Sequence, residues 1–224
     1  MILRFSVRQS CWLLIPLLLL TALSGLAAEY KVHPWTPRAI ETYAARLTSE
    51  GITIAIDPLF SDALAAQVFD KSDMVTRGIM PLAVIIFNSN DFAVEVEGPS
   101  IELLENEHRL RSVDPLLAVQ CVYVSKPTRI VLPSPIPLPK ITVTKSHAGA
   151  CQDFKEKFLA VKRVEPHASA GGFLYVPVTD AASLRKDLAN AKIYIPHIYR
   201  GDSGDSLMFF EIDLKAAIEA SARK

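Results

Sequence analysis

The amino-acid sequence predicts a mainly β protein, an antiparallel β-sandwich of immunoglobulin-like character with three or four short helices. Three observations support this prediction. About eight short segments either alternate apolar and polar residues or are apolar throughout, as strands are. Clusters of Gly, Asn, Asp and Pro separate these segments, which favours strands in hairpin-like succession. Strands and helical patterns do not alternate along the chain, so a parallel sheet of strand–helix–strand units is not expected.

The N-terminus has the order of residues that is typical of a secretory signal peptide. Arg4 and Arg8 are basic, an apolar run follows, and small residues lead up to Ala27 and Ala28. We expect cleavage after one of these two alanines, and export to a periplasmic or extracellular compartment. The alternative is an uncleaved membrane anchor, although the apolar run is shorter than the roughly 18–20 residues that a spanning helix needs.

The predicted organisation is a signal peptide at residues 1–28 and a single exported β-sandwich domain at residues 29–224. The full chain carries 24 basic and 24 acidic side chains, and loss of the signal peptide leaves a small acidic excess. Because there is no basic excess, nucleic acid is not an expected partner. A membrane is expected as a partner only if the signal segment stays uncleaved.

The first element expected after the signal is an N-terminal helix over residues 36–51. Thr36 suits its N-cap, Pro37 suits its first turn, and Gly51 follows its end. Its apolar residues recur at helical spacing and are Ile40, Tyr43, Ala44 and Leu47.

Strands and one short helix are expected next. Residues 52–57 alternate as a half-buried strand does, and residues 61–69 are alanine-rich, which favours a short helix. Residues 82–87 are apolar on both faces, as in a central strand. Turn residues separate them from an alternating run at residues 92–96, so these two runs are predicted to form a hairpin. A further strand is expected at residues 101–104.

The second half of the sequence begins with a helix at residues 114–119 and a proline-rich connection at residues 126–140. Alternating prolines exclude a central strand and favour an extended, polyproline-like crossover over a partner-binding segment. The remaining expected elements are a helix at residues 151–162, strands at residues 171–178, 193–199 and 208–214, and a short C-terminal helix. Acidic residues on the outward face of the predicted strands, which solvation explains better than catalysis, are Glu95, Glu97, Glu211 and Asp213.

Two cysteines, Cys121 and Cys151, remain after cleavage of the signal peptide. In an oxidising compartment such a pair is a candidate disulfide. Closing a loop of this size would stabilise the fold by roughly 3–4 kcal/mol through the unfolded state. The alternative is two unrelated buried thiols.

Residues 201–205, Gly-Asp-Ser-Gly-Asp, resemble the Gly-Asp-Ser-Gly-Gly loop around the nucleophile of chymotrypsin-like serine proteases. Catalysis there needs the serine beside a histidine base that an aspartate orients. Here Asp205 replaces the second glycine, and no Ala-Ala-His-Cys motif lies upstream. A polar hairpin turn is therefore the preferred interpretation, and no catalytic residue is assigned.

The sequence also predicts no metal and no cofactor. No two histidines have the spacing of zinc ligands, and Asp202 and Asp205 offer too few oxygens for a calcium loop. Glycine-rich phosphate loops and paired-cysteine redox motifs are missing from the sequence. The histidines are His33, His108, His147, His167 and His197.

Residues 51–59 (Gly-Ile-Thr-Ile-Ala-Ile-Asp-Pro-Leu) and residues 78–88 (Gly-Ile-Met-Pro-Leu-Ala-Val-Ile-Ile-Phe-Asn) resemble segments of uncharacterised exported bacterial proteins. Residues 172–175 (Gly-Phe-Leu-Tyr), with residues 191–196 and 209–212, extend the resemblance over most of the domain. It implies a β-rich envelope or secreted domain, and it implies no substrate and no catalytic residue.

The preferred interpretation of function is an exported, non-enzymatic binding or accessory module. Its protein partner in the cell envelope would bind a sheet face or add a strand to a sheet edge. The alternative is a secreted hydrolase with a site assembled from residues distant in sequence, using Ser203 or a histidine. A deep pocket with convergent titratable groups would favour the enzyme, and a flat, exposed apolar patch would favour binding.

Overall fold

A computed structural model describes residues 30–105, 108–123 and 147–221 of the chain. The predicted signal peptide at residues 1–28 and the proline-rich connection at residues 126–140 lie outside the described residues. Within the described ranges, no helix is both long enough and apolar enough to cross a membrane.

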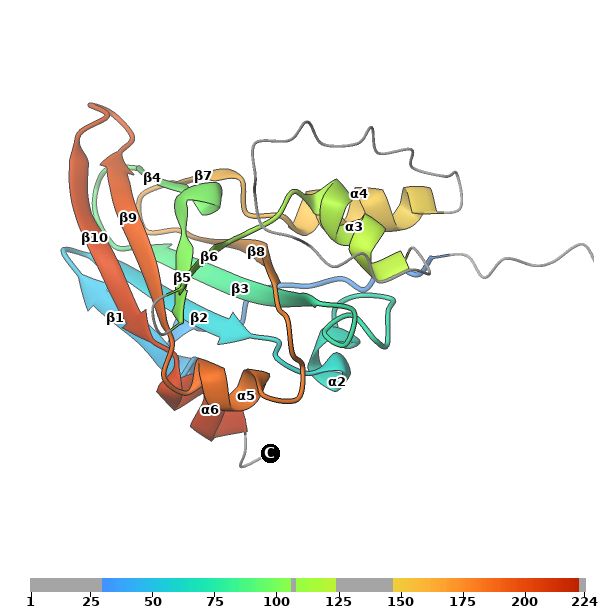
Figure 1. Cartoon of the computed structure of the whole chain (residues 1–224). Helices are drawn as coiled ribbons and strands as arrows, with labels where there is room; N and C mark the ends of the chain where they lie inside the picture. The colour runs from blue at the N-terminus through green and yellow to red at the C-terminus, as the bar shows by residue number, and fades with distance from the viewer. Residues whose placement is uncertain (1–29, 106–107, 124–146, 222–224) are drawn as a thin grey trace, which may run out of the picture.

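Two antiparallel sheets form the fold (Figure 1). Sheet A has the strand order β1 (Ala45–Ser49), β2 (Ile52–Pro58), β3 (Ile79–Asn88), β8 (Ser169–Pro177). Sheet B has the order β6 (His108–Arg111), β5 (Glu102–Glu105), β9 (Lys192–Arg200), β4 (Val94–Glu97), β7 (Val161–Val164), and β10 (Ser206–Asp213) also pairs with β9. The short helices are η2 (Ile40–Thr42), α2 (Asp62–Ala65), η3 (Gly98–Ser100), α3 (Pro115–Tyr123), α4 (Ala148–Lys157), α5 (Leu184–Leu188) and α6 (Lys215–Ser221).

The predicted fold class is confirmed: the protein is mainly antiparallel β, with two sheets and short helices, consistent with a β-sandwich. Both sheets contribute to one hydrophobic core. The immunoglobulin-like character stays a prediction.

Strand β3 is the central strand that the sequence predicts at residues 82–87. It pairs with β2 on one side and with β8 on the other. Val84 and Ile85 point to opposite faces of sheet A, and both are 0% exposed. Sheet A is therefore covered on both faces at this strand.

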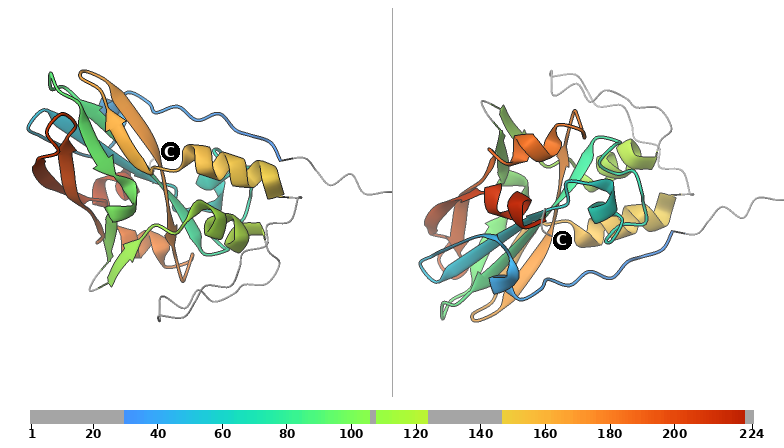
Figure 2. Two further views of the ribbon diagram at one scale, coloured as in Figure 1. Left: turned by 90° about the horizontal axis from the view of Figure 1, so that it is seen from above. Right: turned by 90° about the horizontal axis from the view of Figure 1, so that it is seen from below.

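Aromatic side chains from outside the sheet cover the outer face of sheet A. Phe173 and Tyr175 of β8 share this face. The ring of Trp35, in the N-terminal segment, lies 4.6 Å from the ring of Phe173, and the ring of Phe154, in α4, lies 4.9 Å from that of Tyr175. Phe69, after α2, contacts both Phe154 and Phe173. Figure 2 shows the N-terminal segment and α4 running beside each other in both views.

The predicted helix over residues 36–51 is wrong. After the single 3-10 turn η2, the chain forms β1, which pairs with β2 from Ala45–Ile56 to Ser49–Ile52. Glu50 and Gly51 connect the two strands with φ angles of 45° and 76°, the left-handed conformation that two-residue hairpin turns require. Pairing with β2 satisfies the backbone of β1, and this long-range interaction overrides the helical spacing of its apolar residues.

The predicted hairpin between residues 82–87 and 92–96 is also wrong. Strand β3 belongs to sheet A, whereas β4 pairs with β7 and β9 in sheet B. Asn88, which is 0% exposed, donates from Nδ2 to the backbone oxygens of Phe92 at 2.7 Å and Val164 at 3.2 Å. The turn residues are there as predicted, but the buried amide ties the turn to β7 and so directs the chain into the other sheet.

Smaller differences concern the ends of elements. Helix α2 covers only four of the residues predicted as helical at 61–69. Helix α4 ends at Lys157, so Val161 lies in β7 instead of on the helix. The strands expected at residues 52–57, 171–178, 193–199 and 208–214 are confirmed, as is the C-terminal helix.

Candidate functional site

Residues 201–205, the segment that resembles a protease loop, form the turn between β9 and β10. Ser203 Oγ donates to the Asp205 carboxylate at 2.7 Å and accepts a hydrogen bond from the Asp205 backbone N–H. Arg200 donates two hydrogen bonds to Asp202. The serine is therefore bonded to an acid and not to a histidine base, and the hairpin-turn interpretation is confirmed.

The histidines lie on separate elements. His33 is in the N-terminal segment, His108 in β6, His147 before α4, His167 before β8 and His197 in β9. Within the described ranges, no group of three or more His, Cys, Asp or Glu side chains is arranged to hold a metal ion.

The two cysteines of the candidate disulfide are both free in this structure, Cys121 in α3 and Cys151 in α4. Burial raises the pKa of both thiols. Tyr123, near the end of α3, faces α4, because its ring lies 5.2 Å from that of His147. Cys121 precedes Tyr123 by two residues and so points about 200° away from it around the helix. The disulfide stays a prediction.

A buried polar cluster joins the N-terminal segment to α4. Asp153, 1% exposed, accepts hydrogen bonds from the Tyr30 hydroxyl at 2.5 Å and from Lys157 Nζ at 2.7 Å. Lys157 also donates to the backbone oxygen of Val68 at 2.8 Å. Burial, reinforced by the hydrogen bond to Asp153, raises the pKa of the Tyr30 hydroxyl, which stays protonated as a donor. These groups satisfy one another, so the cluster ties the N-terminal segment to α4.

A small hollow of about 270 Å³ lies near this cluster and is open to solvent. Two of its charged groups already have partners: the Asp70 carboxylate accepts from the backbone N–H of Lys31 at 2.8 Å, and Lys71 pairs with Asp73 at 2.9 Å. The hollow is not the deep polar pocket with convergent titratable groups that an enzyme would need. Its lining residues are His33, Ala66, Phe69, Asp70, Lys71 and Ser72.

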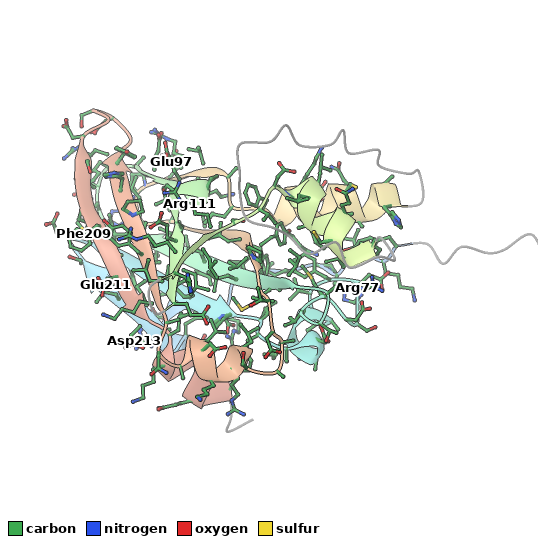
Figure 3. The ribbon with its side chains drawn as sticks, in the orientation of Figure 1. Arg77, Glu97, Arg111, Phe209, Glu211 and Asp213 are labelled. Atoms are coloured by element: carbon green, nitrogen blue, oxygen red, sulfur yellow. The ribbon has the colours of Figure 1, made fainter. Side chains whose placement is uncertain are left out.

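The outer face of sheet B is open to solvent, unlike that of sheet A. Directly opposite residues on paired strands share a face, so the strand register defines this surface. Its members are Glu95, Glu97, Glu102, Arg109, Arg111, Val161, Arg163, Lys192, Tyr194, Tyr199, Phe209, Glu211 and Asp213. Figure 3 labels five of these side chains along sheet B, and Arg77 at the other end of the molecule. The outward orientation predicted for the four acidic residues is confirmed.

Charged side chains on this face are largely paired with one another. Glu102 accepts from Arg109 at 2.9 Å and from Arg111 Nε at 2.8 Å, and its side chain is only 6% exposed. Burial raises the pKa of Glu102, but the two arginines outweigh burial and hold the pKa of the carboxyl below its usual value. Arg163 pairs with Glu95, and Lys192 pairs with Glu211.

Apolar side chains on the same face lack such partners. Phe209 in β10 and Val161 in β7 are each 61% exposed. The ring of Tyr194 lies 6.0 Å from that of Phe209, and the guanidinium of Arg109 lies 6.0 Å from the Tyr194 ring. Aromatic residues and arginine are enriched at protein–protein interfaces. Phe209 and Val161 are therefore exposed apolar side chains among charges that largely pair with one another.

Sequence reasoning missed Phe209. The alternation of Phe210 and Ile212 with Glu211 and Asp213 identified the strand, but it also places Phe209 on the acidic, outward side. A large aromatic residue at a polar position of an alternating strand was the available signal. Register shifts around Met208, between β9 and β10, also blur the pattern there.

Comparisons with known proteins add little to this geometry. No protein-family model matches the chain, and no curated protein matches it. Among solved structures, the chain is similar to YcdA of Bacillus subtilis, described as a "putative lipoprotein", with a TM-score of 0.36 and 13% sequence identity. The match covers 81% of this chain and 42% of that chain, so the matched region is less than half of that chain. The resemblance to uncharacterised exported bacterial proteins stays a prediction.

Proposed function

We propose that this protein is an exported, non-enzymatic binding or accessory module of the cell envelope, and that a protein partner binds the outer face of sheet B. The observation that carries the proposal is the exposure of Phe209 and Val161 on that face, at 61% each. Export is supported by the order of basic, apolar and small residues at the N-terminus.

The chemistry of the face favours a protein over a small molecule. The exposed residues lie on a sheet surface and not in a cavity, and small-molecule sites are concave. Burial of Phe209 and Val161 supplies the hydrophobic contribution, while Arg109, Arg111 and Tyr194 supply the hydrogen-bonding groups typical of an interface. Most nearby charges already pair with one another. When a bound protein excludes water from the face, few of these charges would therefore be left without a partner.

Site-specific photo-crosslinking tests this proposal in the cell that makes the protein. A benzophenone amino acid is placed at Phe209 or Val161, with Val32 as the matched control because it is 58% exposed and lies outside sheet B. We expect discrete crosslinked species from positions 209 and 161 and none from position 32. The same pattern at all three positions, or no crosslink at any, would contradict the proposal.

The non-enzymatic proposal and the hydrolase alternative make opposite predictions for Ser203. If the protein is not an enzyme, a fluorophosphonate probe should leave Ser203 unlabelled, because its hydroxyl is bonded to Asp205 and not to a histidine base. Labelling that is lost in Ser203→Ala would overturn the non-enzymatic assignment. A Ser206→Ala variant, at the start of β10, is the matched control.

A further inference from the structure

The N-terminal segment at residues 30–38, here called the strap, lies on the outer face of sheet A without belonging to any helix or strand. From residue 32 onward its exposed side chains alternate with half-buried ones, as in an extended chain with one face against the protein. The half-buried residues are His33, Trp35 and Pro37.

Side chains, and not backbone pairing, hold the strap in place. Within the described residues, no backbone–backbone hydrogen bond joins the strap to the rest of the protein. The backbone N–H of Lys31 donates instead to the Asp70 carboxylate at 2.8 Å, and Arg38 pairs with Asp57 at 2.9 Å. The two prolines of the strap have no N–H group, and an extended backbone of this kind is readily solvated, so the missing backbone pairing costs little.

Two glycines leave room for the strap. A Cβ atom at Gly149 in α4 would lie 3.0 Å from the Cβ of Tyr30, and a Cβ atom at Gly171 in β8 would lie 3.2 Å from the ring of Trp35. The same tryptophan ring packs 4.6 Å from that of Phe173. The strap therefore fits the surface below it at two points, near its start and near its middle.

The buried charges under the strap keep partners without it. Asp153 accepts from Lys157 Nζ at 2.7 Å as well as from the Tyr30 hydroxyl, and Lys157 also donates to the backbone oxygen of Val68. Opening of the strap would remove only the hydroxyl and leave the charge pair intact. The other group that it would uncover is apolar: Phe173, which is 0% exposed under the strap.

We propose that the strap is detachable: it leaves the outer face of sheet A as one unit while both sheets stay folded, and its opening uncovers the aromatic surface of β8. Segments with few backbone hydrogen bonds to the rest of a protein open at a lower free energy than its core strands. The inference goes beyond the proposed function and does not rest on it, because the strap lies on sheet A and the proposed binding face on sheet B. Sheet A would then have an apolar outer surface that is exposed only in the open form.

Tryptophan fluorescence reports on the strap alone. The chain has two tryptophans, Trp12 in the expected signal peptide and Trp35 in the strap, so the mature chain keeps only Trp35. In a urea titration of the mature chain, we expect the Trp35 emission to shift to the red at a lower urea concentration than the far-UV circular dichroism of the sheets is lost. Coincident transitions would mean that the strap and the sheets unfold together, and they would overturn the inference.

Gly149→Leu tests whether the strap opens as one unit, because the new side chain would clash with Tyr30. We expect the Trp35 transition to move to lower urea, or the emission to be red-shifted already in buffer. The circular dichroism transition should not fall, since leucine favours a helix more than glycine does.

Gln152→Leu, at an exposed position of the same helix, is the matched control and should leave the Trp35 transition unchanged. If Gly149→Leu fails to fold, Gly149→Ala replaces it, because its Cβ alone would lie 3.0 Å from that of Tyr30. An equal drop in both transitions, or an unchanged Trp35 transition, overturns the inference.

Discussion

The outer faces of sheet A and sheet B differ in whether other segments cover them. On sheet A, Trp35 of the N-terminal segment and Phe154 of α4 cover the aromatic residues of β8. On sheet B, Phe209 and Val161 stay 61% exposed. Both sheets bury apolar residues on their inner faces, so the difference comes from the segments packed on the outside. An apolar side chain on a sheet face becomes core only when another element covers it, and it is otherwise a candidate contact.

The largest expected effect on stability comes from the contact between the N-terminal segment and α4, which together cover the outer face of sheet A. Asp153→Ala leaves Lys157 buried without its charge partner and Tyr30 without its acceptor. We expect a loss of about 3–5 kcal/mol in the free energy of unfolding. Urea denaturation measures it.

The matched control removes both charges. Asp153→Leu combined with Lys157→Met should recover most of the loss, because no unpaired charge remains buried. If the double variant is as unstable as Asp153→Ala, the loss of stability comes from altered side-chain packing and not from an unpaired buried charge.

Truncation in β3 tests whether sheet A is covered on both faces. Val84→Ala and Ile85→Ala should each cost roughly 2–4 kcal/mol, because each removes methyl groups from a fully buried site and leaves a cavity. Glu95→Ala on the open face of sheet B should change stability by no more than about 0.5 kcal/mol. Urea melts compare the three variants, and a near-neutral result at either apolar position would mean that sheet A also has an open face.

The ion cluster on sheet B should give a smaller, pH-dependent effect. The folded pKa of Glu102 lies below its unfolded value of about 4.3. The cluster therefore stabilises the fold above that pH, and this contribution is lost as the pH falls through the folded value. Glu102→Gln should cost about 1 kcal/mol at neutral pH, since both arginines are largely exposed. Thermal melts between about pH 7 and pH 3 should show the difference from wild type shrinking with acid, and a constant difference would exclude ionisation as its cause.

The smallest expected effect belongs to the exposed aromatic residue. Phe209→Ser should change the unfolding free energy of the dilute chain by no more than about 0.5 kcal/mol, because its side chain contributes little to the core. Chemical denaturation at low protein concentration measures this. A cost comparable to that of Ile85→Ala would mean that Phe209 is part of the core, and the contrast between the two sheets would no longer hold.

Local patterns predicted much of this fold but little of its candidate site. The alternation in residues 52–57 and 208–214 identified strands, and the fully apolar run at 82–87 identified a central one. The candidate binding face depends on Phe209, which the alternation places on the outside, and on the absence of a covering element in the described structure. Sequence patterns carry no information about that second condition, because it depends on where distant segments pack.

By itself, the sequence determined where most of the strands lie, which of their side chains avoid water and where the chain turns. Only the tertiary structure decided which strands are neighbours. Residues 36–51 have helical spacing, but residues 45–49 of this stretch pair as a strand with β2, and the turn at Asn88 leads into the other sheet through a buried amide. The physical reason is that periodicity is a property of consecutive residues, whereas strand pairing depends on backbone hydrogen bonds and packing between residues far apart in the chain.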